Sequence, residues 1–394
     1  MSIGNGSQVK KVLIVAMIDS VHTGRWISQF DGEAFDFVLF PSTPNRRIHS
    51  LIKQRLKGSF AGQVRISRWM KWASLPLGLA DLVFANFFRA KLLAHEINKF
   101  QPDVIHIMET QHAGYLTDRA LNTVKSKPRV ILSIWGSDLF WFQRFAKHRS
   151  RIKSVLNKVD LLVMECHRDR ELALTLGFEG VFFESMPATG GMNTELLAQK
   201  ARQIPAKERK WIAVKGYSGF VGQGKDAMKV ISEIENQITD FSVMVYSAGL
   251  GTQWFARRLQ KKMGTRLVIA RKHKLSNNDI EEMFLKSRAA LGLSLSDGLP
   301  ATVKEAMSMG AFPVQTSTSC AGEWFINGAT GILVEPNEIT NIATALMRVL
   351  SDDELVESAL IDNLIKAEQL FSETVLKEKA KKLYSSIIET KNLS

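Results

Sequence analysis

Two carboxylates, Asp297 and Glu305, stand eight residues apart where an apolar strand pattern gives way to a helical one. The strand is expected to end near Leu295, and a helix to begin at about Ala301, directly after Pro300. Proline is favoured there because its missing N–H would have no partner in the first helical turn. The other amides of that turn attract a diphosphate. The two carboxylates could then accept hydrogen bonds from hydroxyls at both ends of a nucleotide-sugar.

The elements that must position these carboxylates follow a strand–helix alternation. Short continuous apolar runs indicate buried parallel strands at 211–214, 241–247, 267–270, 289–295, 312–315 and 332–334. Helical patterns lie between the runs, and Ser276 with Asp279 is a capping-box pattern that predicts a helix start. This alternation is typical of a doubly wound α/β domain.

The first half of the chain shows the same alternation. Its apolar runs occupy 12–18, 37–40, 104–108, 130–134, 161–164 and 181–183. Between the halves, prolines and glycines with few apolar residues in register indicate a linker. The expected parts are a Rossmann-like domain at 1–186, a linker at 187–208, a second Rossmann-like domain at 209–370 and a C-terminal helix at 371–394.

The stretch from Ser294 to Pro336 resembles the donor-binding signature of retaining GT-B glycosyltransferases, especially glycosyltransferase family 4, the group 1 transferases. The family pattern begins with an acidic residue, then any seven residues, then a Glu. A run that ends in Pro-Val follows, and after it a Glu precedes a Gly-x-x-Gly-x-Leu-Val segment. Here Asp297 takes the first acidic position, where the family usually has Glu, and Glu305 takes the second. The resemblance implies the GT-B fold, with two Rossmann-like domains facing each other across a cleft and the last helix crossing back to the first.

By this resemblance, the second half binds the donor. Asp297 and the amides of Gly298 and Leu299 would contact the donor sugar, and Glu305 would contact the nucleotide ribose. Thr302, in the first helical turn, completes this donor-binding set.

Two lysines occupy the place of the family's basic residues. Lys215 and Lys225 flank a glycine-containing loop and are candidates for the diphosphate, whose negative charge grows as the glycosidic bond breaks. The loop is not a P-loop, because the Gly-Lys-Ser/Thr ending is absent.

The first half is expected to supply the acceptor side. His22, Thr23, Gly24 and Arg25 follow the first strand, where family members carry a loop near the diphosphate and acceptor.

Three further residues of the first half are catalytic candidates by resemblance. Residues 102–106 match the family's Pro-Asp-x-x-His strand, whose own histidine, His106, is expected to be structural. The family's loop histidine would fall at Met108, so the following Glu109 and His112 become candidates. Asp138 ends a Trp-Gly-Ser-Asp segment that resembles another strand end of the family.

The resemblance implies a retaining enzyme of the hexosyltransferase type. It would move a sugar from a UDP-, GDP- or ADP-sugar to a hydroxyl of a glycan or lipid-linked acceptor, without a metal or other cofactor. A front-face mechanism and a double displacement both remain open. Family analogy favours bacterial surface polysaccharide or lipopolysaccharide biosynthesis.

Positive charge is unevenly distributed along the chain. The formal net charge is +13, and eleven basic residues against two acidic ones lie between Arg46 and Lys99. Aromatic residues share this stretch, and the combination fits contact with an anionic membrane or acceptor and, equally, a solvated helical face over core aromatics. Nucleic acid is a less favoured partner. The residues expected on this surface are Arg65, Arg68, Trp69, Lys71 and Trp72.

Composition limits the protein class. A hydrophobic content of 45% and a charged content of 23% fit a globular protein and exclude collagen, coiled coil and disorder. Two cysteines are too few for a disulfide framework or a Cys-ligated zinc site. We expect no signal peptide and no membrane span, and hence a cytoplasmic protein that binds peripherally at the inner membrane face.

Two alternative functions stay open on the sequence. A GT-B sugar-nucleotide epimerase would share the architecture and donor site but need no acceptor. A non-enzymatic protein that binds anionic surfaces would explain the basic stretch. Hydride transfer is disfavoured, because no Gly-x-Gly-x-x-Gly follows the first strand.

Overall fold

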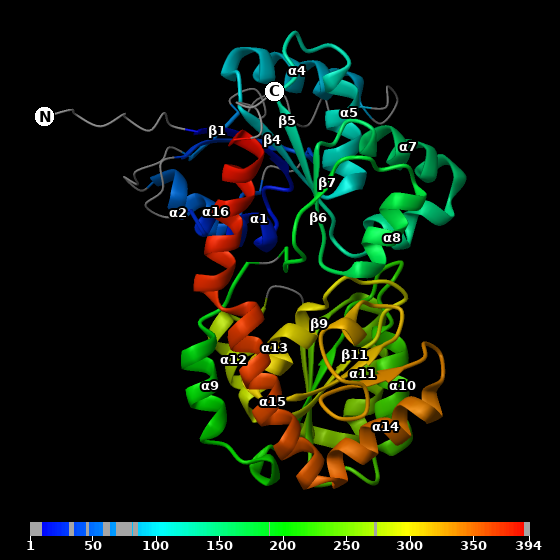
Figure 1. The fold of residues 1–394 in the computed structure, drawn as a ribbon. Helices are drawn as coiled ribbons and strands as arrows, with labels where there is room; N and C mark the ends of the chain where they lie inside the picture. The colour runs from blue at the N-terminus through cyan, green and yellow to red at the C-terminus, as the bar shows by residue number, and fades with distance from the viewer. Residues whose placement is uncertain are drawn as a thin grey trace, which may run out of the picture. The chain divides into compact units, whose positions relative to one another are not determined.

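The computed structural model describes residues 10–30, 35–44, 47–57, 64–67, 81, 86–188, 190–271 and 274–389. The chain divides into two compact units, which are Met1–Gly191 with Leu376–Ser394 (unit 1) and Met192–Val375 (unit 2). Each unit contains a parallel β-sheet with helices packed on both faces (Figure 1). The α/β class and the two Rossmann-like sheets expected from the sequence are confirmed.

The sheet of unit 1 has the order β3-β2-β1-β4-β5-β6-β7 in the described residues, with every pair parallel. Its strands are β1 (Lys10–Ala16), β2 (Phe35–Pro41), β3 (Val64–Ile66), β4 (Val104–Met108), β5 (Arg129–Ser133), β6 (Leu161–Val163) and β7 (Val181–Phe182). β3 is not among the strands expected from the sequence, because three residues at a sheet edge carry too little apolar pattern to be recognised.

Helices cover both faces of this sheet. They are α1 (Val21–Ser28), α2 (Ser50–Lys57), α4 (Phe87–Phe100), α5 (Tyr115–Leu121), α6 (Ser137–Phe140), α7 (Ala146–Leu156), α8 (His167–Thr175) and α16 (Glu373–Glu389), with the short turns η1 (Thr110–Gly114) and η2 (Phe142–Arg144). Side chains alternate along β1, so Leu13 and Val15 pack against α4, α5 and α7, whereas Val12 and Ile14 pack with α1 and α16.

The helix α16 joins unit 1 through a buried polar contact as well as apolar packing. Tyr384 is fully buried, and its hydroxyl accepts a hydrogen bond from Trp26 Nε1 at 2.9 Å. The same hydroxyl lies 2.8 Å from Nδ1 of His106, whose Nε2 lies 2.7 Å from the Ser133 hydroxyl. His106 therefore has a structural role in the core, as expected from its place in an apolar strand.

The buried His106 predicts acid sensitivity for unit 1. Burial lowers the pKa of His106 from about 6.5 to about 3, so the folded state holds a neutral ring. The stability from that neutral ring is fully present above pH 6.5 and is lost as the pH falls toward 3, by about 1.4 kcal/mol per pH unit. Denaturant unfolding measured between pH 7 and 4 should show this slope in wild type and a smaller one in His106→Asn.

The control for this prediction is His95→Asn, because His95 is exposed on α4. That variant should keep the wild-type slope. An unchanged slope in His106→Asn would contradict the prediction.

The sheet of unit 2 has the order β10-β9-β8-β11-β12-β13, again with every pair parallel in the described residues. Its strands are β8 (Trp211–Lys215), β9 (Ser242–Ala248), β10 (Leu267–Arg271), β11 (Ser287–Gly292), β12 (Phe312–Thr316) and β13 (Ile332–Val334). Its helices and short turns are α9 (Thr194–Arg202), η3 (Ala206–Glu208), α10 (Gly224–Ile234), α11 (Leu250–Met263), η4 (Gly264–Arg266), α12 (Asn277–Lys286), α13 (Ala301–Met309), η5 (Ala321–Glu323), α14 (Ile339–Ser351) and α15 (Asp353–Phe371).

The segment expected to be a linker, 187–208, contains the helix α9, which belongs to unit 2. Leu197 and Ala201 of α9 are buried against the sheet and α13. The fully buried Arg209 donates hydrogen bonds to the carbonyl oxygens of Ala201 and Ile204 at 2.9 and 3.1 Å. The prolines and glycines that suggested a linker flank this helix rather than interrupt it.

In the described part of the chain, none of the helices combines the length and apolar character needed to cross a bilayer.

Candidate functional site

The strand order of unit 2 creates a switch point beside its first strand. β8 lies between β9 and β11, so the loops after β8 and β11 lead to opposite sides of the sheet. Ligands of open α/β sheets bind at the carboxyl ends of the strands at such a point. Lys215 is the last residue of β8, and its Nζ lies 3.6 Å from Oδ2 of Asp297 in the loop after β11. Two predicted donor-site residues are thus brought together.

Both backbone polar groups of Gly298, next to Asp297, form hydrogen bonds within the protein. Asp297 Oδ1 accepts a hydrogen bond from the Gly298 amide at 3.0 Å, and the Gly298 carbonyl accepts one from Cys320 at 3.0 Å. The side chain of Leu299 is buried with Trp324 in a small apolar cluster. The Gly298 amide, expected to contact the sugar, is therefore engaged by Asp297, because its short carboxylate reaches the next backbone N–H.

The helix α13 begins and ends where local rules place it. Pro300 is its N-cap residue, and Gly310 ends it with a φ of 79°, a left-handed conformation that glycine adopts without strain. Thr302, in the first turn, is buried, and its hydroxyl lies 2.7 Å from that of Tyr246 on β9. Glu305, one turn further, remains half-buried. Thr302 therefore positions Tyr246, whereas Glu305 keeps exposed surface for a ligand.

Tyr246 lies at this site although no motif in the sequence marks it. Burial raises the pKa of Tyr246 well above its ordinary value, and the negative charges of Glu305 and Asp297 raise it further. The phenol therefore stays protonated beside the two carboxylates. The only sequence signal was its place at the end of an apolar strand, which many core tyrosines share.

Lys225 contacts the start of α11 rather than the Lys215–Asp297 pair. Its exposed side chain covers Gly251, where an added Cβ would lie 2.5 Å from the lysine Cε. The first-turn amides of α11 carry partial positive charge, and the ammonium group adds to it. This combination favours an anion at the N-terminus of α11.

In unit 1, the switch point lies between β1 and β4, and the predicted residues follow β1, β4 and β5. Thr23 and Gly24 are buried in α1, and the Thr23 hydroxyl donates to the Met17 carbonyl at 2.9 Å. His22 and Arg25 keep partial exposure, and the His22 ring packs edge-on against Trp135, which follows β5. His22 and Arg25 are thus partly exposed at this edge, and the Thr23 hydroxyl ties the helix to the preceding loop.

Glu109 fixes the turn η1 that follows β4. Its carboxylate accepts hydrogen bonds from the amide of His112 at 2.9 and 3.0 Å and from the amide of Ala113 at 2.5 Å. The backbone of Glu109 has a φ of 82°, which is a strained value for a residue with a side chain. The turn presents His112 as an exposed residue.

Asp138 fixes the same turn from its other side. It is buried, and its Oδ2 accepts hydrogen bonds from the amide and hydroxyl of Thr110 at 2.8 and 3.2 Å. Burial and then the charge of Glu109 raise the pKa of Asp138 well above its ordinary value, and burial also raises the pKa of Glu109. The three catalytic candidates therefore lie together, with two carboxyl groups that hold the turn and one exposed imidazole.

Sequence family models match both units. Residues 11–165 match the model described as Glycosyl transferase 4-like, and residues 221–365 match the model described as Glycosyl transferases group 1. The chain is a glycosyltransferase of the GT-B class. Asp297 and Glu305, the predicted donor-site carboxylates, fall inside the group 1 match, and the catalytic candidates His112 and Asp138 fall inside the other.

Solved structures share the fold of this glycosyltransferase at low sequence identity. HepE from Anabaena, in complex with UDP and glucose, is 12% identical with a TM-score of 0.69 over 96% of this chain and 100% of HepE. Sucrose-phosphate synthase from Thermosynechococcus elongatus is 14% identical, with a TM-score of 0.68 over 97% and 100%. A glycosyltransferase from Rickettsia africae is 15% identical, with a TM-score of 0.66 over 96% and 98%. No curated protein sequence matches the chain.

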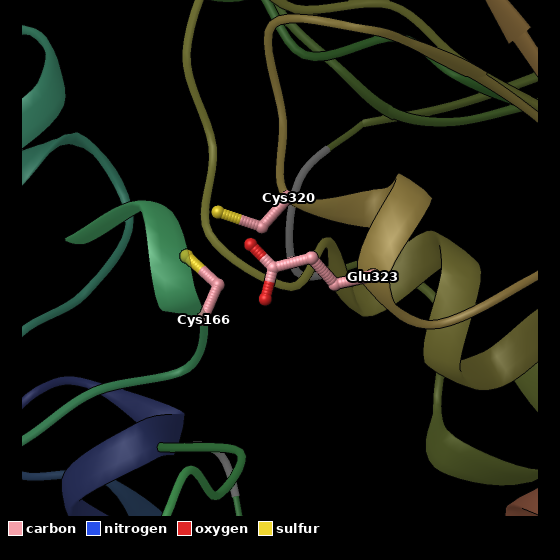
Figure 2. A group of neighbouring side chains, drawn as sticks. All are labelled: Cys166, Cys320 and Glu323. Carbon is pink, nitrogen blue, oxygen red and sulfur yellow. The ribbon is translucent and has the colours of Figure 1, made fainter. Parts of the chain in front are cut away.

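The glycosyltransferase carries a further acidic residue, Glu323, on a turn joined to the loop of Asp297. Figure 2 shows the side chain of Glu323, at the end of η5, beside that of Cys320. Glu323 is exposed, and its amide donates to the carbonyl of the buried Cys320 at 3.0 Å. Cys320 in turn donates to Gly298, so this turn is tied to the loop of Asp297. Cys166, the other labelled cysteine, is a buried residue at the start of α8 in unit 1 (Figure 2).

Most of the basic surface expected on the glycosyltransferase lies outside the described residues. Arg68, Trp69, Lys71 and Trp72 are in that part of the chain. Arg65 on β3 is described, and its guanidinium forms an ion pair with Asp36 at 3.1 Å.

A close approach between two loops of the glycosyltransferase gives a test of the donor site. A Cβ at Gly249, before α11, would overlap the side chain of Ser218 in the loop after Lys215. The φ of Gly249 is −75°, so alanine would be unstrained and act only through this overlap. Gly249→Ala should displace the loop and weaken nucleotide-sugar binding about tenfold in calorimetric titration.

Removing the Ser218 side chain provides the control. The double variant Ser218→Gly with Gly249→Ala should recover most of the affinity, since the Oγ and Cβ atoms of Ser218 that the alanine Cβ would overlap are gone. Equal weakening in the single and double variants would show that the overlap is not the cause.

Proposed function

We propose that the glycosyltransferase moves a hexose from a UDP-, GDP- or ADP-sugar to a hydroxyl of a glycan or lipid-linked acceptor, with retention of configuration. The observation that carries this proposal is the cluster at the carboxyl edge of the unit 2 sheet. There, Lys215 and Asp297 lie 3.6 Å apart, and the charge of Glu305 acts on Tyr246. The carboxylates accept hydrogen bonds from sugar and ribose hydroxyls, and the lysine attracts the diphosphate. The complex of HepE with UDP and glucose supports a nucleotide-sugar donor.

In the proposed reaction, the bond between the sugar C1 and the diphosphate oxygen breaks, and the electron pair leaves with the nucleoside diphosphate. Lys215, Lys225 and the N-terminus of α11 stabilise the negative charge that develops, without requiring a metal ion for that task. The acceptor oxygen bonds to C1 on the same face, and its proton passes to the departing phosphate oxygen.

The hydrogen bonding in unit 1 supports this front-face course over a double displacement. A double displacement needs a carboxylate free to attack the sugar carbon. Glu109 and Asp138 are instead buried, and both accept hydrogen bonds from backbone amides of η1. We therefore assign them to positioning and assign the contact with the reacting groups to His112, with His22 and Arg25 beside the acceptor.

We further propose that the reaction belongs to bacterial surface polysaccharide or lipopolysaccharide synthesis at the inner face of the membrane. The excess of basic residues between Arg46 and Lys99 supports contact with anionic lipid. Neutralising Arg65, Arg68 and Lys71 together should reduce sedimentation with phosphatidylglycerol vesicles. Unchanged sedimentation would remove this surface from the proposal.

A donor panel tests the proposed reaction. The protein is incubated with UDP-, GDP- and ADP-sugars, with and without a lipid-linked glycan, while nucleotide release and the anomeric proton of the product are followed. Release that depends on the acceptor, with retained configuration, is expected. Binding of none of these donors would defeat the transferase proposal, and conversion of the sugar without acceptor would favour an epimerase.

A further inference from the structure

A cationic cavity of about 360 Å³ lies between α5 and α7 of unit 1, outside the residues used above. Its lining consists of Tyr115, Asp118, Arg119, Asn122, Lys147 and Arg151. α5 starts at Tyr115, immediately after the turn η1 that presents His112. The lining of the cavity therefore adjoins η1.

The charges in this cavity do not balance. The one carboxylate among the six lining residues, Asp118, is 2.7 Å from Lys158 and accepts a hydrogen bond from Ser154 at 2.9 Å. Its charge is thus neutralised by a residue that does not line the cavity. Lys147 and Arg151 form no ion pair with any residue that the structure describes. They are spaced i, i+4 on one face of α7, where like charges repel.

The polar groups around these cations are held in defined positions. The guanidinium of Arg151 lies 3.7 Å from the ring centre of Tyr115, and the Tyr115 hydroxyl lies 2.9 Å from Nδ1 of His148. Burial raises the pKa of Tyr115 to about 12, so this hydroxyl keeps its proton. Lys158 donates to Oδ1 of Asn122 at 2.6 Å, which leaves the amide NH₂ of Asn122 to donate.

The neighbouring histidine responds to the positive potential. Burial and then the charges of Arg151 and Lys147 lower the pKa of His148. Protonation of His148, which would add a further positive charge next to this cavity, is therefore disfavoured. An anion in the cavity would relieve the repulsion between the cations already there.

We propose that the cavity between α5 and α7 binds a phosphate ester through Lys147 and Arg151. Arginine presents several N–H donors in a planar fork that matches phosphate oxygens, and the lysine adds a compact charge. The volume exceeds that of a phosphate group alone and accommodates a small organic substituent. The same phosphate chemistry occurs in soluble phosphate esters and in anionic lipid headgroups, and the experiment separates these sources.

The experiment titrates the full-length protein with glycerol 3-phosphate by calorimetry and, in parallel, measures cosedimentation with vesicles of phosphatidylglycerol in phosphatidylcholine. The test variant is Lys147→Gln with Arg151→Gln. The matched control is Arg149→Gln with Lys153→Gln, which removes the same charge from exposed positions of α7 that do not line the cavity. Circular dichroism verifies that each variant is folded.

At least tenfold weaker binding of one of the two probes is expected in the test variant, with little change in the control. Loss of glycerol 3-phosphate binding alone assigns a soluble ester, and loss of vesicle binding alone or with it assigns a lipid headgroup. Equal losses in both variants would show a diffuse charge effect and overturn the site, as would no binding of either probe by wild type. This test does not depend on the proposed transfer, because neither readout requires turnover.

Discussion

Replacing Glu305 with glutamine is expected to weaken nucleotide-sugar binding and lower kcat/KM by roughly 10- to 150-fold. A hydrogen bond to a charged group contributes about 1.5–3 kcal/mol, and removing the charge leaves the shape of the site intact. Glu305 is half-buried on α13, a helix already fixed by Pro300 and Gly310, so the glutamine variant should fold normally. Calorimetric titration with the preferred donor and initial-rate kinetics measure the two effects.

Glu282→Gln is the matched control for this prediction. Glu282 is exposed on α12 and pairs with Lys286 on the same helix, so its loss should leave donor binding unchanged. Wild-type donor affinity in Glu305→Gln would refute the assigned donor contact. It would also remove the support that Glu305 gives to the proposed function.

Replacing Glu109 with alanine is expected to destabilise unit 1 by about 3 kcal/mol and to lower kcat by roughly 100-fold. The carboxylate is the acceptor for the amides of His112 and Ala113, and a backbone N–H that loses its partner carries a desolvation penalty of about 1–3 kcal/mol. The loss also frees the turn that holds His112, and a misplaced catalytic group is costly for the rate. Denaturant unfolding and steady-state kinetics measure the two effects.

Two further variants separate positioning from chemistry. His112→Ala should lower kcat without changing stability, because the side chain of His112 is exposed. Glu109→Gly should lower kcat as much as Glu109→Ala but be about 1 kcal/mol more stable, since glycine tolerates the φ of 82°. If Glu109→Ala kept wild-type kcat, η1 would have no part in catalysis.

The repeated strand–helix pattern was predictable because it depends on local sequence. Continuous apolar runs indicated every strand of the described residues except β3, and the capping box of Ser276 and Asp279 is present at the start of α12. The three residues of β3 form a strand only because they pair with β2. The apolar residues of α9 were outweighed by flanking prolines and glycines, and their burial depends on α13 and the sheet.

The candidate site was predictable in part for the same reason. Asp297 and Glu305 share one strand–turn–helix segment, so their proximity follows from a few adjacent residues. The engagement of the Gly298 amide by Asp297 was missed, because it depends on the conformation of a single turn. The buried hydrogen bonds of Glu109 and Asp138 were missed as well, since burial depends on the packing of the whole unit.

The sequence by itself determined the α/β class, the start of α13, and the two candidate carboxylates Asp297 and Glu305, because hydrophobic period and helix-end preferences act over a few residues. Only the tertiary structure decided which distant residues meet. The Lys215–Asp297 pair, the place of Tyr246 beside Glu305 and the cationic cavity between α5 and α7 depend on strand order and helix packing. Contacts between residues far apart in the chain leave no periodic signal in either segment, so the fold alone reveals them.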